Sequence, residues 1–300
     1  MDRLDELAVF LAVLESGSLS AAARRLRRSA PAVTRTLAGL EARMGARLIE
    51  RTTRRLAVTQ AGRRLAEQAR AILAGYDAAI DQGAAGPLTG EIRISAPLVF
   101  GRRHVAPLLL RFLDAHPRVT GDLVLNDRSL DIVDEGLDVA VRLAVLADSG
   151  LVARKVGEVR RLTVATPDYV ARHGAPRTPG DLAGHELIYS STQPGPVEWR
   201  FQGPRGSQVV RPRPRLMINS VEAVIAAILA GRGVGRVLSY QVADELADGR
   251  VVRLLADHEP APIPVQLVTA GTRLIPARVR AFLDFAAAEL TALPVIRPQA

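Results

Sequence analysis

Apolar residues recur at helical spacing over the first part of the chain. Residues 3–15 keep this spacing and are predicted to form an amphipathic helix, whose buried face would hold Leu4, Leu7, Leu11 and Leu14. Gly17 ends this helix. Ser18 can then cap a short second helix that runs to about Leu26, because a serine oxygen accepts a hydrogen bond from a free N–H group at a helix start.

A third helix is predicted after a turn at Arg27 and Arg28. Ser29 can cap this helix, and Pro31 lies in its first turn, where the missing N–H group costs little. The apolar stripe of the helix consists of Val33, Leu37 and Leu40. The opposite face consists of Pro31, Thr34, Arg35 and Ala38. The pattern therefore predicts a helix that buries one side and exposes the other.

The helical pattern ends before residues 44–58. Two short strands are predicted there, at 48–50 and 55–58, around the turn 51–54. Thr59 can cap a long helix from about Gln60 to Gln82. The apolar positions of this helix step by four, three, four and three residues, and they are Leu65, Ala69, Ile72, Tyr76 and Ala79. This heptad spacing predicts a dimerisation seam, and the alternative is a helix that packs on its own domain.

Residues 83–90 (GAAGPLTG) have the composition of a linker. Beyond them, strands and helices are predicted to alternate, which indicates an α/β architecture. Strands are predicted at 91–95, 119–125, 138–142 and 265–269, helices at 102–115, 129–135 and 276–290, and a further set of both over 162–255. We expect two α/β lobes, and the pattern leaves open where the chain crosses between them.

Composition and charge narrow the possible functions. The chain has 300 residues, enough for two or three folded units, and no cysteine, which excludes disulfides, zinc–thiolate sites and thiol nucleophiles. The net charge is +9, and residues 1–60 hold eleven arginines against six acidic residues. This basic N-terminal unit indicates a polyanionic partner, although a GC-rich genome also enriches arginine.

Membrane association is not expected. Acidic residues interrupt the apolar N-terminus, no signal-peptide cleavage site follows it, and the apolar run 223–231 is too short to span a bilayer. We therefore expect a cytoplasmic protein.

Enzyme motifs are weak. Asp148-Ser149-Gly150 is not part of a G-x-S-x-G elbow, and the histidines at 104, 116, 173, 185 and 258 lack metal-ligand spacing. Gly231, Gly233 and Gly235 are similar to a dinucleotide loop, but they follow a predicted helix and precede a strand, the reverse of the required order. We predict no catalytic residue, metal or cofactor. A solute receptor without gene regulation is a further alternative.

Three N-terminal segments carry a family resemblance: LAVFLAVLESGSLSAAARRL, SAPAVTRTLAGLEARMGARLIERTTRRL and VTQAG. They resemble the DNA-binding domain of the LysR-type transcriptional regulators. The later segments EIRISAP, GRRHVAPLLLRFLDAHP, LDVAVR and AGRGVGRVLSY resemble that family's sensor domain, so the resemblance covers essentially the whole chain. Pro31 lies one place later than the usual proline, and Ile49 stands where an aromatic residue is common.

The resemblance implies an α/β fold with an N-terminal all-α winged helix-turn-helix, a long linker helix and a two-lobed effector domain like a periplasmic binding protein. The implied units are a DNA-binding domain at 1–59 with its helix-turn-helix at about 19–38, a linker and dimerisation helix at 60–82, a hinge at 83–90, lobe one at 91–161 and 264–300, and lobe two at 162–263. The expected partners are double-stranded promoter DNA, a small-molecule effector, further copies of the chain in a homodimer or homotetramer, and RNA polymerase.

DNA contacts are expected from the exposed face of the third helix. Thr34 and Arg35 offer polar and basic groups there, and arginine can donate two hydrogen bonds to guanine. Serines at helix starts suit phosphate oxygens, and the hairpin tip would reach the backbone or the minor groove. The predicted DNA-binding residues are Ser18, Ser20, Ser29, Pro31, Thr34, Arg35, Arg51, Thr52 and Arg54.

The effector site follows from the resemblance, because the family binds a small molecule between its lobes, where strand ends meet helix N-termini. The residues that this implies are Ser95, Ala96, Pro97, Asp127, Arg142, Thr192 and Asn219. Helix N-termini and an arginine favour a small organic anion, whereas Asp127 would favour a cationic group. Ser95 can instead be a plain helix cap, and Arg142 can instead form a surface ion pair.

Overall fold

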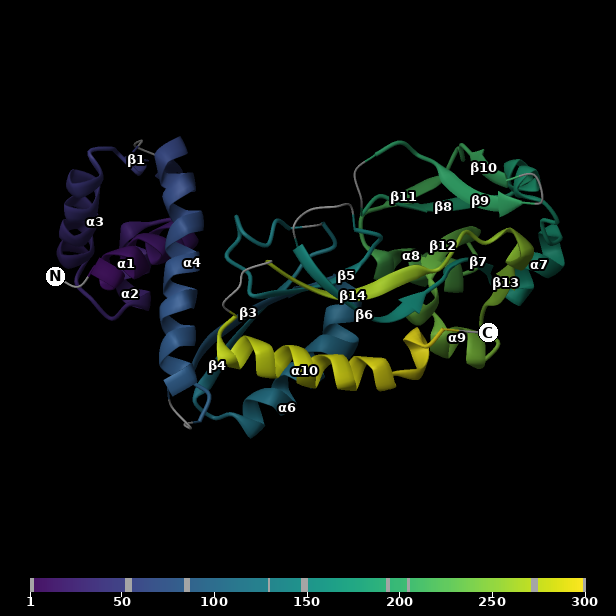
Figure 1. Cartoon of the computed structure of the whole chain (residues 1–300). Coiled ribbons are helices and arrows are strands. Elements are labelled where there is room, and N and C mark those ends of the chain that lie inside the picture. The colour runs from purple at the N-terminus through teal and green to yellow at the C-terminus, as the bar shows by residue number, and fades with distance from the viewer. Residues whose placement is uncertain are drawn as a thin grey trace.

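The computed structural model describes residues 3–51, 56–83, 87–128, 130–146, 151–192, 195–203, 206–270 and 275–298. It contains an N-terminal helical domain, the long helix α4 (Gln60–Gly83) and two α/β lobes. Figure 1 shows α4 standing between the N-terminal domain and the lobes, with the second lobe farthest from the N-terminal domain.

The N-terminal domain has the predicted helices and hairpin, which are α1 (Arg3–Ser16), α2 (Leu19–Arg25), α3 (Ala30–Met44), β1 (Ile49–Arg51) and β2 (Leu56–Val58). Ser18 and Ser29 cap α2 and α3 as predicted. Their Oγ atoms accept hydrogen bonds from the N–H groups of Ala21 and Ala32 at 3.1 and 3.3 Å. The predicted stripe of α3 is buried at Val33, Leu37 and Leu40.

Helix α4 starts directly after the hairpin, in which β1 pairs antiparallel with β2. Thr59 caps it as predicted, because its Oγ1 accepts a hydrogen bond from the N–H group of Gly62 at 3.0 Å. The helix start lies so close to the hairpin that a Cβ atom on Gly62 would stand 2.2 Å from the carbonyl oxygen of Leu48. Only glycine fits this contact without moving the backbone.

The heptad positions of α4 divide into two groups. Leu65 and Ala69 are 7% and 0% exposed and belong to the core that the N-terminal domain forms with α4. Ile72 and Tyr76 are 50% and 49% exposed. The side chain of Ala79 lies outside the described set. Leu65 and Ala69 therefore pack on their own domain, which was the alternative to a dimerisation seam. Ile72 and Tyr76 leave apolar surface exposed.

Lobe one contains a mixed five-stranded sheet in the order β4-β3-β5-β14-β6. Its elements are β3 (Gly90–Ala96), α5 (Leu98–Phe100), a π-helical turn (Gly101–Val105), α6 (Ala106–Ala115), β4 (Val119–Leu125), β5 (Val139–Leu143), β6 (Leu151–Val159), β14 (Ile263–Ala270), α10 (Ala277–Ala292) and a 3₁₀ turn (Pro294–Ile296). β3 runs parallel to β4 and β5, whereas β14 runs antiparallel to β5 and β6. Helices α6 and α10 pack on this sheet through one apolar core.

The helix predicted at 129–135 is wrong for the described part of that segment. Residues 132–136 form a turn. The Asp131 carboxylate caps this turn by accepting hydrogen bonds from the N–H groups of Val133 and Asp134 at 2.8 and 3.0 Å, and Gly136, with a φ of 63°, ends the turn before it extends into a helix. Ser129 lies outside the described residues.

Lobe two contains a second five-stranded sheet, in the order β11-β8-β12-β7-β13, and a separate hairpin. Its elements are β7 (Arg161–Ala165), α7 (Pro167–His173), β8 (Leu187–Ser190), β9 (Trp199–Gly203), β10 (Gly206–Val210), β11 (Leu216–Ile218), α8 (Val221–Leu229), β12 (Val234–Leu238), α9 (Ala243–Ala247), β13 (Val252–Leu254), and 3₁₀ turns at Pro179–Gly184, Ser239–Gln241 and Ala256–His258. β11, β8 and β12 are parallel, and β7 is antiparallel to β12 and β13. The chain crosses between the sheets at Arg160 and returns between β13 and β14.

The glycine run before β12 has a packing role. Gly233 has a φ of 146°, and a Cβ atom there would stand 2.3 Å from the carbonyl oxygen of Glu186. A Cβ atom on Gly235 would stand 2.4 Å from Cδ1 of Ile228. These glycines let β12 lie against β8 and α8, which accounts for their spacing without a nucleotide.

Within the described residues, no single helix has the length and apolar character needed to cross a membrane. α1 and α2 together are long and apolar enough, but the chain bends by 118° between them.

Candidate functional site

Helix α3 lies on the side of the N-terminal domain away from the lobes (Figure 1). Pro31, Arg35 and Ala38 are exposed on it, and Thr34 is partly exposed. Arg35 makes no hydrogen bond or ion pair with the rest of the described chain. A surface guanidinium of this kind is available to a phosphate or to the edge of a base.

The predicted serines keep a donor for a ligand. The Oγ atoms of Ser18 and Ser29 accept hydrogen bonds from their helices, and a hydroxyl can still donate its own hydrogen to a phosphate oxygen. Ser20 is exposed on α2. Thr52 and Arg54 lie outside the described residues, as does the side chain of Arg51.

Other arginines of the N-terminal domain differ in their availability. Arg28 donates two hydrogen bonds to Asp5, at 2.8 and 2.7 Å, and this contact lowers the pKa of the Asp5 carboxyl. Arg25 binds the carboxylates of Glu15 and Glu91. Arg24 and Arg27 are exposed and have no such pairing among the described residues. They add free positive charge beside α3 that we did not predict, although the cluster RRLRR signalled it.

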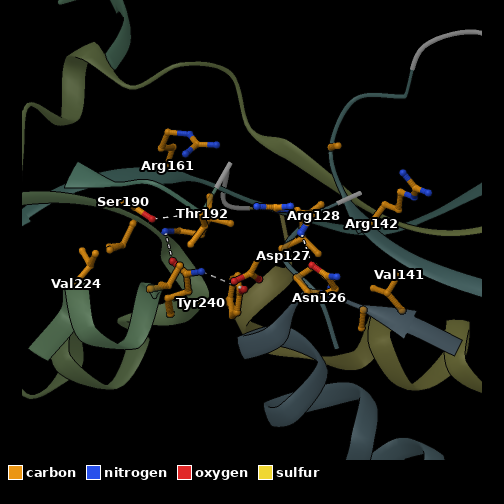
Figure 2. Close-up of a pocket in the computed structure, with 18 of the residues that line it drawn as sticks. Asn126, Asp127, Arg128, Val141, Arg142, Arg161, Ser190, Thr192, Val224 and Tyr240 are labelled. Atoms are coloured by element: carbon orange, nitrogen blue, oxygen red, sulfur yellow. Dashed lines mark hydrogen bonds between the residues drawn. The ribbon is translucent and has the colours of Figure 1, made fainter. Parts of the chain in front are cut away.

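A cavity of about 270 Å³ lies where the carboxyl ends of the parallel strands of both lobes meet. Strand ends of this kind commonly hold ligands, because backbone groups and loop side chains converge there. Figure 2 shows Asn126, Asp127 and Arg142 on one side of this cavity and Arg161, Ser190 and Thr192 on the other. The predicted Ser95, Ala96 and Pro97 also line it.

The lobe-one wall is largely occupied by its own hydrogen bonds. The Asp127 carboxylate accepts a hydrogen bond from the N–H group of Leu98 at 3.0 Å, so it caps the helix start at which we predicted an anion. The cap residue of that helix is Pro97, which leaves Ser95 out of the capping role. Arg142 donates to the carbonyl oxygen of Leu130. Burial lowers the pKa of Arg142.

The lobe-two wall differs from the prediction. The Thr192 hydroxyl lies 3.2 Å from that of Ser190 at the end of β8. Asn219 is exposed after β11 and is not among the residues that line the cavity. Arg161, Arg236 and Tyr240 line the cavity and were not predicted.

Burial raises the pKa of Tyr240 to about 12, so its phenol stays protonated even well above neutral pH. Its hydroxyl accepts a hydrogen bond from the Gln241 side chain at 3.2 Å and can donate to a ligand. Arg236 and Tyr240 both belong to the segment AGRGVGRVLSY, whose family resemblance could have marked them as site residues.

Charged contacts join the N-terminal domain to lobe one. Glu15 on α1 binds Arg25 at 2.6 Å and Arg93 of β3 at 3.4 Å, and Arg25 also binds Glu91 at 2.8 Å. From α4, Arg70 donates to the carbonyl oxygen of Val133 at 2.6 Å. These ion pairs and hydrogen bonds connect lobe one to α1, α2 and α4.

No group of three or more histidine, aspartate or glutamate side chains within the described ranges is arranged to hold a metal ion.

The sequence matches known family models over both of its parts. Residues 4–63 match the bacterial regulatory helix-turn-helix proteins of the lysR family, and residues 85–291 match the LysR substrate binding domain. The chain belongs to the LysR family of transcriptional regulators. This confirms the predicted family and class of function, a DNA-binding regulator of transcription with an effector-binding domain and not an enzyme.

Relatives of this LysR-family chain are similar over nearly their full length. The chain is 35% identical over 283 residues to the transcriptional regulator PtxR of Pseudomonas aeruginosa, covering 94% of this chain and 91% of PtxR. It is 31% identical to CrgA of Neisseria meningitidis serogroup C, covering 95% of this chain and 96% of CrgA.

Solved LysR-family structures confirm the predicted fold. The full-length virulence activator AphB of Vibrio cholerae is 27% identical, with a TM-score of 0.63 over 96% of this chain and 99% of AphB. The structure of CrgA from Neisseria meningitidis is 30% identical, with a TM-score of 0.60 over 97% of this chain and 99% of CrgA.

Proposed function

We propose that this LysR-family regulator reads promoter DNA by placing the outward face of α3 in the major groove, with Arg35 on a base edge and Thr34 beside it. The observation that carries the proposal is the exposed, unengaged guanidinium of Arg35 on a helix whose opposite stripe is buried. Phosphate contacts would come from the serines at the helix starts and from Arg51, Thr52 and Arg54 of the hairpin.

Replacing Arg35 with alanine tests this proposal. The variant should keep its fold, because the side chain is exposed and forms no hydrogen bond or ion pair with the described residues. It should lose about 1–3 kcal/mol of discrimination between specific and scrambled DNA, which corresponds to roughly 5- to 150-fold in relative affinity. Fluorescence anisotropy at fixed salt, with DNA from upstream of the chain's own gene and a scrambled duplex, measures this ratio.

Arg232→Ala is the matched control, since it removes the same charge from an exposed position in lobe two. It should change neither affinity. Equal weakening of Arg35→Ala on both duplexes would reduce Arg35 to a phosphate contact, and unchanged binding to both would remove it from the interface.

We further propose that a small organic anion between the lobes controls this DNA binding. Four arginines and one acidic residue line the cavity, which favours an anion over a cation. Two lobes joined by two crossings can close around such a ligand, and the contacts of Glu15 and Arg70 would carry the movement toward the N-terminal domain.

Assembly would use the exposed apolar pair on α4, Ile72 and Tyr76, to form a homodimer, with a homotetramer as the larger possibility. Contact with RNA polymerase stays a prediction from the resemblance. Promoter DNA as the partner would place the protein in the cytoplasm.

A further inference from the structure

Two arginines of lobe two lie at the junction of two cavities. The first is the cavity of about 270 Å³ between the lobes, called the effector cavity below, and the second lies beside it in lobe two. Arg161 begins β7, Arg236 lies in β12, and each lines both cavities. In the antiparallel pairing of these strands Arg236 is opposite Thr163. Because side chains two residues apart on a strand share a face, Arg161 projects from the same face as Thr163 and is a diagonal neighbour of Arg236.

Arg236 is buried without being satisfied. It is 7% exposed, and its Nε and Nη2 atoms have no hydrogen-bond partner in the described part of the chain. Its guanidinium carbon lies 4.4 Å from the ring centre of Phe201 and 5.8 Å from that of Trp199. The aromatic rings therefore pack against the guanidinium, and two of its nitrogen donors stay unpaired among the described residues.

The electrostatic surroundings of Arg236 favour an incoming negative charge. Burial, followed by the charge of Arg161, lowers the pKa of Arg236 to about 9, so the group is still charged at neutral pH. The charge of Glu259 opposes this effect only in part. Burial of the cation is therefore costly, and an anionic ligand would reduce that cost.

Nearby acids are engaged elsewhere. Glu259 accepts two hydrogen bonds from Arg253 at 2.5 and 2.6 Å, and Glu198 accepts one from Arg211 at 3.2 Å. Asp127, across the effector cavity, caps the helix start in lobe one. Within the described residues neither Arg161 nor Arg236 therefore forms an ion pair, and Glu259 acts on Arg236 only from a longer distance.

The second cavity has a volume of about 480 Å³, and its wall combines an apolar part with charged residues that include Glu198 and Arg200. That wall includes Tyr189, Pro196, Trp199, Pro260, Ala261 and Ile263. The rings of Tyr189 and Trp199 are nearly parallel, at 13°, with their centres 6.5 Å apart. The hydroxyls of Ser190 and Thr192 stand at the junction with the effector cavity and can donate hydrogen bonds there.

We infer that the effector is a carboxylate with a flat apolar body, that its carboxylate binds between Arg161 and Arg236, and that its body extends into the second cavity beside Tyr189 and Trp199. This inference rests on the proposed function, in which a ligand between the lobes controls the regulator. It moves the anion subsite from the lobe-one helix start, which Asp127 already caps, to lobe two.

Isothermal titration calorimetry on the full chain tests the inference with benzoate, 2-naphthoate and 4-biphenylcarboxylate. At least one of these acids should bind, and its neutral carboxamide and plain acetate should bind at least tenfold more weakly. Arg161→Gln and Arg236→Lys should each weaken the acid by roughly 10- to 100-fold, because each removes charge-assisted hydrogen bonds. Arg232→Gln, an exposed change in the same lobe, should leave affinity unchanged.

Several results would overturn the inference. These are the failure of all three acids to bind, equal binding of acid and carboxamide, or a loss of affinity in Arg142→Gln that Arg161→Gln does not show. If Arg236→Lys fails to fold, Arg161→Gln at its exposed position carries the test. Specific DNA binding is measured in parallel. Its absence refutes the proposed function, whereas specific DNA binding without any response to the acids refutes only the ligand class.

Discussion

The uncovered stripe on α4 allows a quantitative test of assembly by Ile72→Glu. Ile72 and Tyr76 are 50% and 49% exposed, and they share a helix face because they are four residues apart. Full burial of a large apolar side chain stabilises by about 1.5–3 kcal/mol, so covering the remaining half of each gives about 1 kcal/mol. Two such residues from each of two protomers contribute roughly 4 kcal/mol to a dimer.

Glutamate at position 72 removes the isoleucine contribution and adds a charge to the seam, which costs several kcal/mol. The dimer dissociation constant should rise by roughly 1000-fold, and sedimentation velocity over a concentration series measures it. Val145→Glu is the control, because Val145 is 81% exposed and lies outside α4. An unchanged mass for Ile72→Glu would refute the reasoning and move the interface away from this stripe.

Two further predictions concern stability. The Glu6 carboxylate is 1% exposed and lies 2.7 Å from Arg43. Arg43→Ala removes the cation of this buried carboxylate and should lower the free energy of unfolding, measured with urea, by roughly 3 kcal/mol. An unchanged midpoint of urea unfolding would show that the ion pair does not stabilise the domain. Arg28 lowers the pKa of Asp5 below 3.8, so its contribution is present above that pH and is lost as the pH falls through the folded-state value. The free energy of unfolding of Asp5→Asn should therefore fall less with decreasing pH than that of the unchanged protein. An equal fall in the two proteins would contradict this.

Local features of the fold could be predicted because local hydrogen bonding determines them. Ser18, Ser29 and Thr59 cap their helices as the sequence indicates, since a hydroxyl at a helix start needs only the N–H groups a few residues ahead. The helix predicted after Ser129 is wrong for a local reason too, because Gly136, with a φ of 63°, ends the turn that Asp131 caps.

Features that depend on distant residues could not be predicted in the same way. A heptad spacing does not distinguish a seam between chains from a face that packs on its own domain, and Leu65 and Ala69 take the second course. Arg236 lies in a strand whose neighbours are apolar, and its position beside Phe201 depends on how lobe two folds. Arg142 could be placed at its strand end, whereas its bond to Leu130 depends on the turn that replaced a predicted helix.

DNA affinity as a function of salt tests most directly whether this chain reads sequence under the control of a ligand. The measurement compares DNA from upstream of the chain's own gene with a scrambled duplex, each without and with the acid that binds best. Affinity for both duplexes should fall steeply with salt, because arginines displace counterions from phosphates. The upstream DNA should be preferred throughout, and the acid should change its affinity more than that of the scrambled duplex. Equal affinity for the two duplexes at every salt concentration, with or without the acid, would contradict this function.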